Sequence, residues 1–226
     1  MNATVTTPAP RLALIHALTH SVAPINDALL RDWPAATRMN LMDDSLSADL
    51  AAAGGVLDAA MTARFVRLGD YAVATGADAV LFTCSAFGSC IEAVAQRLAA
   101  IPVLKPNEAM VADAVAMHTE RGLKIGLLAS FAPTLMSMPP EFPPGVALET
   151  ELAEGAMAAL NAGDLARHDA LAIEAAARLA ARGCGVIALA QFSLARCAEG
   201  VAQRTGLPVL TTVGSAVNQL KRRLGA

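Results

Sequence analysis

Short aliphatic runs alternate with longer stretches of helical periodicity along most of this chain. Such alternation is typical of parallel strands joined by helical crossovers. The aliphatic runs predict strands at Leu12–His16, Thr37–Met42, Ala79–Thr83, Pro102–Leu104, Lys124–Ala129, Ala147–Glu151, Val186–Ala190 and Pro208–Thr211. The helical patterns are clearest at Ala59–Thr75, Ile91–Ala99, Glu108–Arg121, Leu165–Arg182, Leu194–Thr205 and Gly214–Leu224. Prolines between positions 133 and 144 predict an irregular loop after the fifth strand.

The chain contains an internal repeat. The segment GADAVLFTCSAFGSCIEAVAQRLAAIPVL, from Gly76, aligns with GCGVIALAQFSLARCAEGVAQRTGLPVL, from Gly183. An offset of 107 pairs the two VAQR tetrapeptides and also pairs Cys90 with Cys197, and a slip of one residue aligns the two PVL tripeptides. LALIHA, from Leu12, is more weakly similar to IGLLAS. Chance similarity between alanine-rich units accounts for the shared alanines but not easily for these matches in one register.

The repeat predicts an α/β fold made of two pseudo-symmetric halves, each a small parallel sheet with flanking helices. We expect a first domain of residues 1–110 plus 211–226 and a second of residues 111–210. Ligands of such sheets bind beyond the carboxyl ends of the strands, so the active site is expected in the cleft between the halves.

Composition narrows the class of protein. Of 226 residues, 55% are apolar but only 4% aromatic, which predicts an aliphatic core. The net charge is −3 and the basic residues are scattered, so neither nucleic acid nor a membrane surface is an expected partner. No apolar run approaches the ~20 residues of a membrane span. Residues 1–10 read as a short flexible tail rather than a signal peptide, so the expected location is the cytoplasm.

Four cysteines in a cytoplasmic chain suggest free thiols rather than disulfides. None belongs to a CxxC pair, and no cluster of His and Cys has zinc-ligand spacing, so no metal is expected. Cys90 and Cys197 occupy equivalent helical positions and are expected to pack against the sheets. Cys184 precedes its strand and is expected at the far end of the sheet.

Cys84 and Gln191 follow equivalent strands of the two halves, each in a turn that leads into a helix. A cysteine at a helix N-terminus feels the positive end of the dipole, which favours the thiolate. The backbone N–H groups that follow, around Ser85 and Ala86 and around Ser193, suit a carboxylate or a developing enolate. A lone cysteine is otherwise most often a small buried apolar residue. Its polar, glycine-containing turn favours a catalytic role for Cys84.

Other polar residues also follow strands, and for His16 and Asp43 the sequence allows either a functional or a structural role. His16 is either a second acid/base or a satisfied hydrogen bonder. Asp43 either receives an ammonium or hydroxyl group or helps to cap a helix. Ser130 is expected to bind a carboxylate, and the aromatic residues that follow Ser130 and Gln191 are further expected substrate contacts. These two are Phe131 and Phe192. Of the helical histidines, His118 and His168 are expected on the surface.

These segments together resemble the aspartate/glutamate racemase superfamily, which includes hydantoin racemases, maleate isomerases and arylmalonate decarboxylases. The resemblance spans nearly the whole chain and is strongest in GADAVLFTCSAFG, IPVLKPNEAM, KIGLLASF and GVIALAQFSLAR. It implies an active site between two domains, without cofactor or metal. It also implies two cysteines, one from each half, that act on opposite faces of a carbon beside a carboxyl or carbonyl group.

Cys84 falls on the first of these cysteine positions, but the second is Gln191. Glutamine cannot exchange a proton as a thiol does, so symmetrical two-base racemisation is not the expected reaction. The family's decarboxylases manage with one cysteine, although they keep it in the other half. We therefore expect a racemase-like isomerase that transfers a proton in a small carboxylic acid or carbonyl compound, and a homodimer or higher homo-oligomer. A single-cysteine decarboxylase, a covalent isomerase and a non-catalytic binding protein stay open as alternatives.

Overall fold

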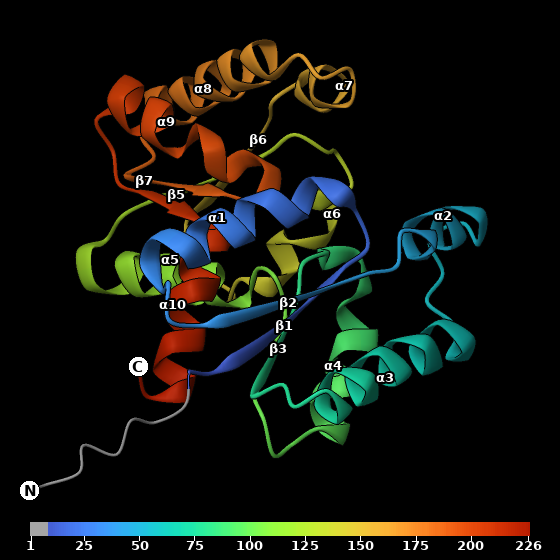
Figure 1. Ribbon diagram of the computed structural model, residues 1–226. Coiled ribbons are helices and arrows are strands. Elements are labelled where there is room, and N and C mark those ends of the chain that lie inside the picture. Colours follow the sequence, from blue (N-terminus) through green and yellow to red (C-terminus); the bar gives the residue numbers. More distant parts are fainter. Residues whose placement is uncertain (1–8) are drawn as a thin grey trace, which may run out of the picture.

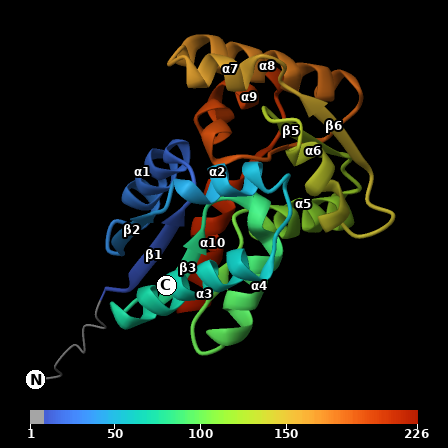
Figure 2. The ribbon, with the colours of Figure 1, turned by 90° about the vertical axis from the view of Figure 1, so that its right-hand side faces the viewer.

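The computed structural model describes residues 9–226 and contains two four-stranded parallel sheets, ordered β2–β1–β3–β4 and β6–β5–β7–β8. The strands are β1 (Arg11–His16), β2 (Thr37–Met42), β3 (Ala79–Phe82), β4 (Val103–Leu104), β5 (Ile125–Ala129), β6 (Leu148–Leu152), β7 (Val186–Leu189) and β8 (Val209–Thr211). Each sheet forms the centre of one lobe (Figures 1 and 2). The α/β fold class with two pseudo-symmetric halves is therefore confirmed.

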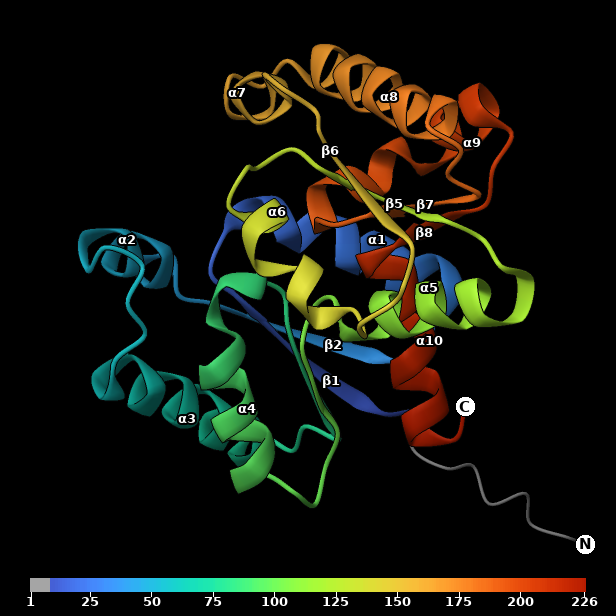
Figure 3. The same cartoon turned by 180° about the vertical axis from the view of Figure 1, so that it is seen from behind.

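Helices cover both faces of each sheet. They are α1 (Val22–Asp32), α2 (Ser45–Ala52), α3 (Ala59–Ala74), α4 (Gly88–Arg97), α5 (Glu108–Arg121), α6 (Thr134–Ser137), α7 (Ala156–Asn161), α8 (Leu165–Ala181), α9 (Ala198–Thr205) and α10 (Thr212–Leu224). In the first lobe α1 and α10 pack on one face and α2, α3 and α4 on the other. In the second lobe α8 and α9 pack opposite α5 (Figure 3).

Four short 3₁₀ helices complete the architecture. They are η1 (Thr19–Ser21), η2 (Ser85–Phe87), η3 (Pro139–Glu141) and η4 (Phe192–Cys197). The helix α10 returns to the first lobe, where Val213 and Leu220 join the core of its sheet. The domain bounds expected from the sequence stay a prediction. Among the described residues, no helix has the length and apolar character needed to cross a membrane.

The strand registers reproduce the sequence repeat. In the first sheet Leu12 pairs with Ala79, and in the second Ile125 pairs with Val186, which are the residues that the repeat aligns. On the other side of the central strands, Val80 pairs with Val103 and Ile187 with Val209, so the slip of one residue also appears in the pairing.

The burial of α3 and α8 follows the same offset of 107. The buried residues of α3 are Met61, Phe65, Gly69 and Ala72, and their counterparts His168, Ala172, Ala176 and Leu179 are all buried in α8. The glycines that follow the two helices, Gly76 and Gly183, have matching φ angles of 82° and 81°. Both ends therefore use the left-handed conformation that glycine adopts without steric cost.

The structure differs from the predicted elements in several places, and α7 is one helix that lies where none was predicted. No helix was predicted over α1, whose first turn contains Pro24; proline is tolerated there because the first amides of a helix have no partner within it. The predicted helix 194–205 divides into η4 and α9, and the proline-rich segment contains the short α6 and η3. The predicted tail lies mostly outside the described residues.

Candidate active site

Cys84 follows β3 in extended conformation and directly precedes η2, as the sequence predicts. The side chain is partly exposed and packs against the apolar cluster formed by β1, β3, α3 and α4. A small depression with no room for a water molecule adjoins it. Its lining is almost entirely apolar and consists of Ile15, His16, Ala17, Leu46, Phe65, Phe82, Cys84 and Phe87.

Burial raises the pKa of the Cys84 thiol above its usual value, and a hydrogen bond from the backbone N–H of Ala86 lowers it only in part. The sequence led us to expect a stabilised thiolate, and this expectation was wrong. The helix that follows directly is a three-residue 3₁₀ turn, and the one amide aimed at the sulfur does not offset the loss of water. At neutral pH the structure favours a protonated thiol, which is a proton donor.

This direction of the pKa shift predicts slow alkylation of Cys84. Iodoacetamide reacts with thiolates, so the rate at neutral pH should lie below that of a free cysteine and should rise through a pH range above the usual thiol pKa. Peptide mass spectrometry after timed alkylation measures the rate at Cys84 separately from the other cysteines. Alkylation at pH 7 at or above the rate of free cysteine would contradict the raised pKa of Cys84.

His16 is completely buried at the end of β1, and both its ring nitrogens have partners. Nδ1 lies 2.9 Å from Oγ1 of Thr83 and 3.2 Å from Oγ of Ser21, and Nε2 lies 3.0 Å from Oδ1 of Asn40. Burial lowers the pKa of His16, and the hydrogen bond to Asn40 works in the opposite direction. Of the two predicted readings, the geometry favours the satisfied hydrogen bonder.

The surrounding amides determine which nitrogen of His16 carries the proton. The carbonyl of Val22 accepts from Nδ2 of Asn26 at 2.8 Å, which fixes the orientation of that amide. The same Nδ2 donates to Oδ1 of Asn40 at 2.7 Å, so the atom that faces Nε2 of His16 is an acceptor. Nε2 therefore carries the proton, and Nδ1 accepts from the hydroxyl of Thr83. Thr83 directly precedes Cys84, so this network anchors the turn that contains Cys84.

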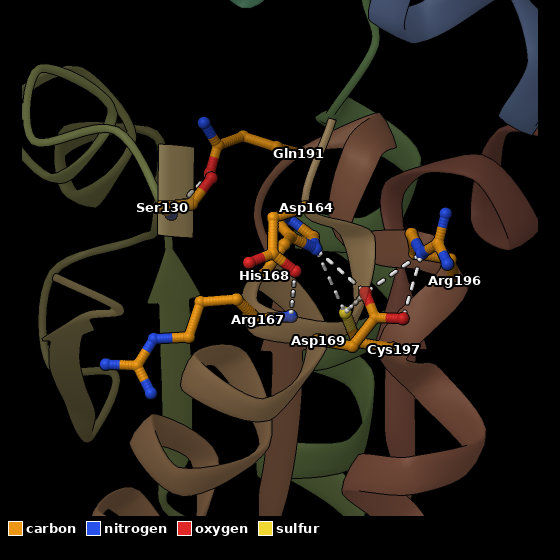
Figure 4. A network of polar contacts seen from close by, with 8 residues as sticks. All are labelled: Ser130, Asp164, Arg167, His168, Asp169, Gln191, Arg196 and Cys197. Carbon is orange, nitrogen blue, oxygen red and sulfur yellow. Dashed lines mark hydrogen bonds and ion pairs between the residues drawn. The ribbon is translucent and has the colours of Figure 1, made fainter. Parts of the chain in front are cut away.

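Gln191 follows β7 and precedes η4, the place that Cys84 has in the first lobe. Its Oε1 accepts hydrogen bonds from the backbone N–H of Ser130 at 2.7 Å and from the hydroxyl of Ser130 at 3.2 Å (Figure 4). A backbone N–H can only donate, so the oxygen of the amide must face Ser130. The NH₂ group points away from Ser130 and has no hydrogen bond to another described residue.

The other predicted contacts occupy different environments. Ser85 and Ser193 are partly exposed, Ala86 is exposed, and Phe131 keeps 49% of its surface accessible. Phe192 is buried in the core between η4 and the first-lobe sheet, so only its backbone is available to a ligand. Its large apolar side chain is more stable there than in a polar cleft.

Asp43 is engaged within its own lobe. Its carboxylate accepts from Oγ of Ser45 at 2.6 Å and from the guanidinium of Arg64 at 2.7 Å. Burial acts to raise the pKa of Asp43, but the hydrogen bonds from Ser45 and Arg64 bring it below its usual value. The geometry favours the structural reading, in which Asp43 holds the start of α2.

The turns of the two lobes approach each other. In contact across the lobes are η1 with η4 and η2 with α6. Nε2 of His20, in η1, also lies 3.1 Å from Oδ1 of Asn161 at the end of α7. The strand-end residues of both lobes therefore lie along one inter-lobe boundary. A larger cavity, of about 600 Å³, lies between β6 and α8 and includes none of the predicted site residues.

Sequence reasoning placed one histidine wrongly and missed two polar residues. His168 was expected on the surface but is completely buried, because it occupies the core position that Met61 has in the first lobe. Thr83 and Asn40, which hold His16, were not singled out. A polar residue at the end of a buried strand was the only available signal for Thr83. One group of potential metal ligands also occurs among the described residues, at His168, Asp169 and Cys197.

Two parallel-sheet lobes, with Cys84 and Gln191 at equivalent strand ends, match the two-lobed α/β architecture expected of the family that the sequence resembles. The family model described as Asp/Glu/Hydantoin racemase matches residues 19–220. The chain belongs to this family. It is an enzyme of the isomerase or decarboxylase type, since the structures similar to it include both racemases and a decarboxylase. The corresponding comparison with curated proteins gave no match.

Solved structures share the fold at low sequence identity. Glutamate racemase RacE1 from Bacillus anthracis has a TM-score of 0.71 and 12% identity, over 97% of this chain and 83% of that chain. Allantoin racemase from Klebsiella pneumoniae has a TM-score of 0.72 and 16% identity, over 96% of this chain and 88% of that chain. Unliganded arylmalonate decarboxylase has a TM-score of 0.68 and 14% identity, over 96% and 94%.

Proposed function

We propose that this enzyme transfers a proton on one face of a carbon beside a carboxyl or carbonyl group, with Cys84 as the acid/base and Gln191 as a hydrogen-bond donor. The observation that carries this proposal is the pairing of Cys84 and Gln191 at equivalent strand ends of the two lobes. A thiol from one lobe and an amide from the other supply one exchangeable proton and one neutral donor. The substrate is a small carboxylic acid or related carbonyl compound.

Gln191 is suited to bind an anionic oxygen. Because Ser130 engages the Oε1 atom, the NH₂ group is the end that can donate to a substrate carboxylate or a developing enolate. Backbone amides at Ser85 and Ser193, together with the hydroxyl groups, would provide further donors. Donors that are oriented before the reaction stabilise the planar anion without reorganisation at the moment it forms.

Decarboxylation of a malonate-type acid is the reaction that this asymmetry favours. The carbon–carbon bond to one carboxylate breaks, its electron pair enters the enediolate as CO₂ leaves, and the thiol of Cys84 then protonates the carbon. Solvent returns a proton to the sulfur. The step begins with a protonated thiol, and this is the form that the raised pKa of Cys84 favours. One-base isomerisation is the second candidate, because the family supports it. That reaction has to begin with Cys84 as a thiolate, which takes the proton from the substrate.

Incubation in D₂O with a panel of malonate-type acids, other small carboxylic acids and hydantoins tests this chemistry. We expect NMR to show deuterium at the carbon beside the carboxyl or carbonyl group of at least one compound, with CO₂ release if the reaction is a decarboxylation. Tight binding without exchange or CO₂ release would identify a binding protein instead. A substrate adduct on Cys84, detected by mass spectrometry, would replace proton transfer by a covalent mechanism.

The cellular location and the oligomeric state of the enzyme are also proposals. We place the enzyme in the cytoplasm and expect self-association into a homodimer or higher homo-oligomer. Light scattering coupled to size-exclusion chromatography would measure the assembly directly, and a monomer at micromolar concentration would contradict it.

A further inference from the structure

A buried polar cluster lies in the second lobe, behind the turn that starts at Gln191 (Figure 4). His168 and Asp169, in the first turns of α8, meet Cys197 at the end of η4. Nδ1 of His168 lies 2.8 Å from Oδ1 of Asp169, Sγ of Cys197 lies 3.3 Å from the same oxygen, and Sγ lies 3.8 Å from Nδ1. The guanidinium of Arg196 closes the solvent side, with Nε 2.9 and 3.0 Å from the two oxygens of Asp169.

The pseudo-symmetry of the fold shows that this cluster is not needed for packing. At the offset of 107, Met61, Thr62 and Cys90 stand in the first lobe where His168, Asp169 and Cys197 stand in the second. There Oγ1 of Thr62 lies 3.5 Å from Sγ of Cys90, and Met61 is an ordinary core residue. The same helix pair therefore packs without a histidine or a carboxylate.

The histidine is also costly where it stands. Nε2 of His168 is buried and has no hydrogen-bond partner among the described residues. An unsatisfied buried polar atom destabilises a fold, and such atoms are rare in native proteins. A methionine in this position would avoid the cost, so the imidazole requires an explanation other than stability.

The three side chains offer the ligands that a thiophilic divalent cation prefers, namely an imidazole nitrogen, a carboxylate oxygen and a sulfur. Tetrahedral Zn²⁺, with bonds of about 2.0–2.3 Å, places such ligand atoms about 3.3–3.6 Å apart. The observed separations of 2.8, 3.3 and 3.8 Å lie on both sides of that range, so shifts of about half an ångström bring the three atoms to it. The residues come from segments 28 positions apart, which is why no zinc-ligand spacing was visible in the sequence.

We propose that His168, Asp169 and Cys197 bind a thiophilic divalent cation of the Zn²⁺ type, which replaces the guanidinium of Arg196 on Asp169. The fourth ligand is water, admitted on the side that Arg196 leaves. Arg196 is able to leave, because 42% of its side chain is exposed to solvent.

Charges and protons balance in this exchange. A divalent cation with one thiolate carries a net charge of +1, which equals that of the displaced guanidinium. Cys197 releases its proton to solvent, and the proton on Nδ1 of His168 is replaced by one on Nε2, where no hydrogen bond has to break. One proton is released per ion bound. Because a proton is released when the ion binds, acid weakens binding.

Titration of the chelator-treated, reduced protein with Co²⁺ tests the proposal without an activity assay. We expect one ion per chain, a sulfur-to-cobalt charge-transfer band, one proton released per ion in weakly buffered solution, and displacement of the band by Zn²⁺. Zn²⁺ should also raise the thermal unfolding midpoint, since it binds only the folded chain. No band at millimolar Co²⁺ would overturn the proposal.

Matched variants assign the site. Cys197→Ser should remove the band, whereas Cys90→Ala and Cys84→Ser should retain it. His168→Met combined with Asp169→Thr gives the second lobe the residues of the first, so it should fold and show no band. Arg196→Gln should strengthen binding, because the competing cation is gone. A band that survives in the double variant or depends on Cys90 or Cys84 would contradict the assignment.

Discussion

Replacement of Cys84 by serine is expected to reduce turnover roughly 10²–10⁴-fold and to leave the fold intact. Serine has nearly the same shape, and the side chain is only partly buried, so the packing around the turn changes little. A hydroxyl group is a far weaker acid than a thiol, so it protonates an enediolate more slowly. The loss should appear in kcat for whichever compound the D₂O panel identifies.

The control for this prediction is Cys90→Ala. Cys90 lies six residues later, in α4, and is completely buried away from the turn. Its loss should lower the thermal midpoint slightly and leave kcat unchanged. Wild-type kcat in Cys84→Ser, with the circular dichroism spectrum unaltered, would remove Cys84 from the mechanism.

Gln191→Glu is expected to lower kcat by about 10²–10³-fold, the usual effect of removing one oriented donor to a developing oxyanion. Glutamate keeps the shape of glutamine and still accepts from the N–H and hydroxyl of Ser130, so the turn should stay in place. The NH₂ donor, however, becomes a carboxylate oxygen that repels an anionic substrate. KM should therefore rise as well.

Gln219→Glu provides the same chemical change on the exposed side of α10, where Gln219 binds Arg222. It should leave both kinetic constants unchanged. If Gln191→Glu kept the wild-type kcat/KM and bound substrate normally, the amide would have no part in binding the anion. The proposed role of Cys84 would survive that result, because the two variants test different atoms.

Much of the fold could be predicted because its signals are local. Thr37–Met42 and Glu108–Arg121 match the structure at both ends, since an aliphatic run and a capped helical pattern need only neighbouring residues. The register between strands could also be predicted, although it is not local. The repeat supplied this register, because two halves with the same sequence pattern pair their strands in the same way. The helix α1 was not predicted because its apolar face is short and is stabilised by contacts with α10, which is distant in the sequence.

The candidate site could be predicted in position but not in ionisation. The places of Cys84 and Gln191 follow from the ends of their strands. The direction of the pKa shift at Cys84 depends on how much water its surroundings exclude, and the residues that exclude it come from distant strands and helices. His16 is a similar case, because its two readings differ only through contacts with Thr83 and Asn40.

The sequence by itself determined the two-lobed parallel-sheet architecture, the equivalence of Cys84 and Gln191, and the family. Only the tertiary structure decided that burial raises the pKa of Cys84, that the amide of Gln191 turns its NH₂ group away from Ser130, and that His168 is buried beside Asp169 and Cys197. The reason is physical. Periodicity and strand order depend on the chain's local pattern, whereas protonation and hydrogen-bond direction depend on desolvation and on partners that folding brings together.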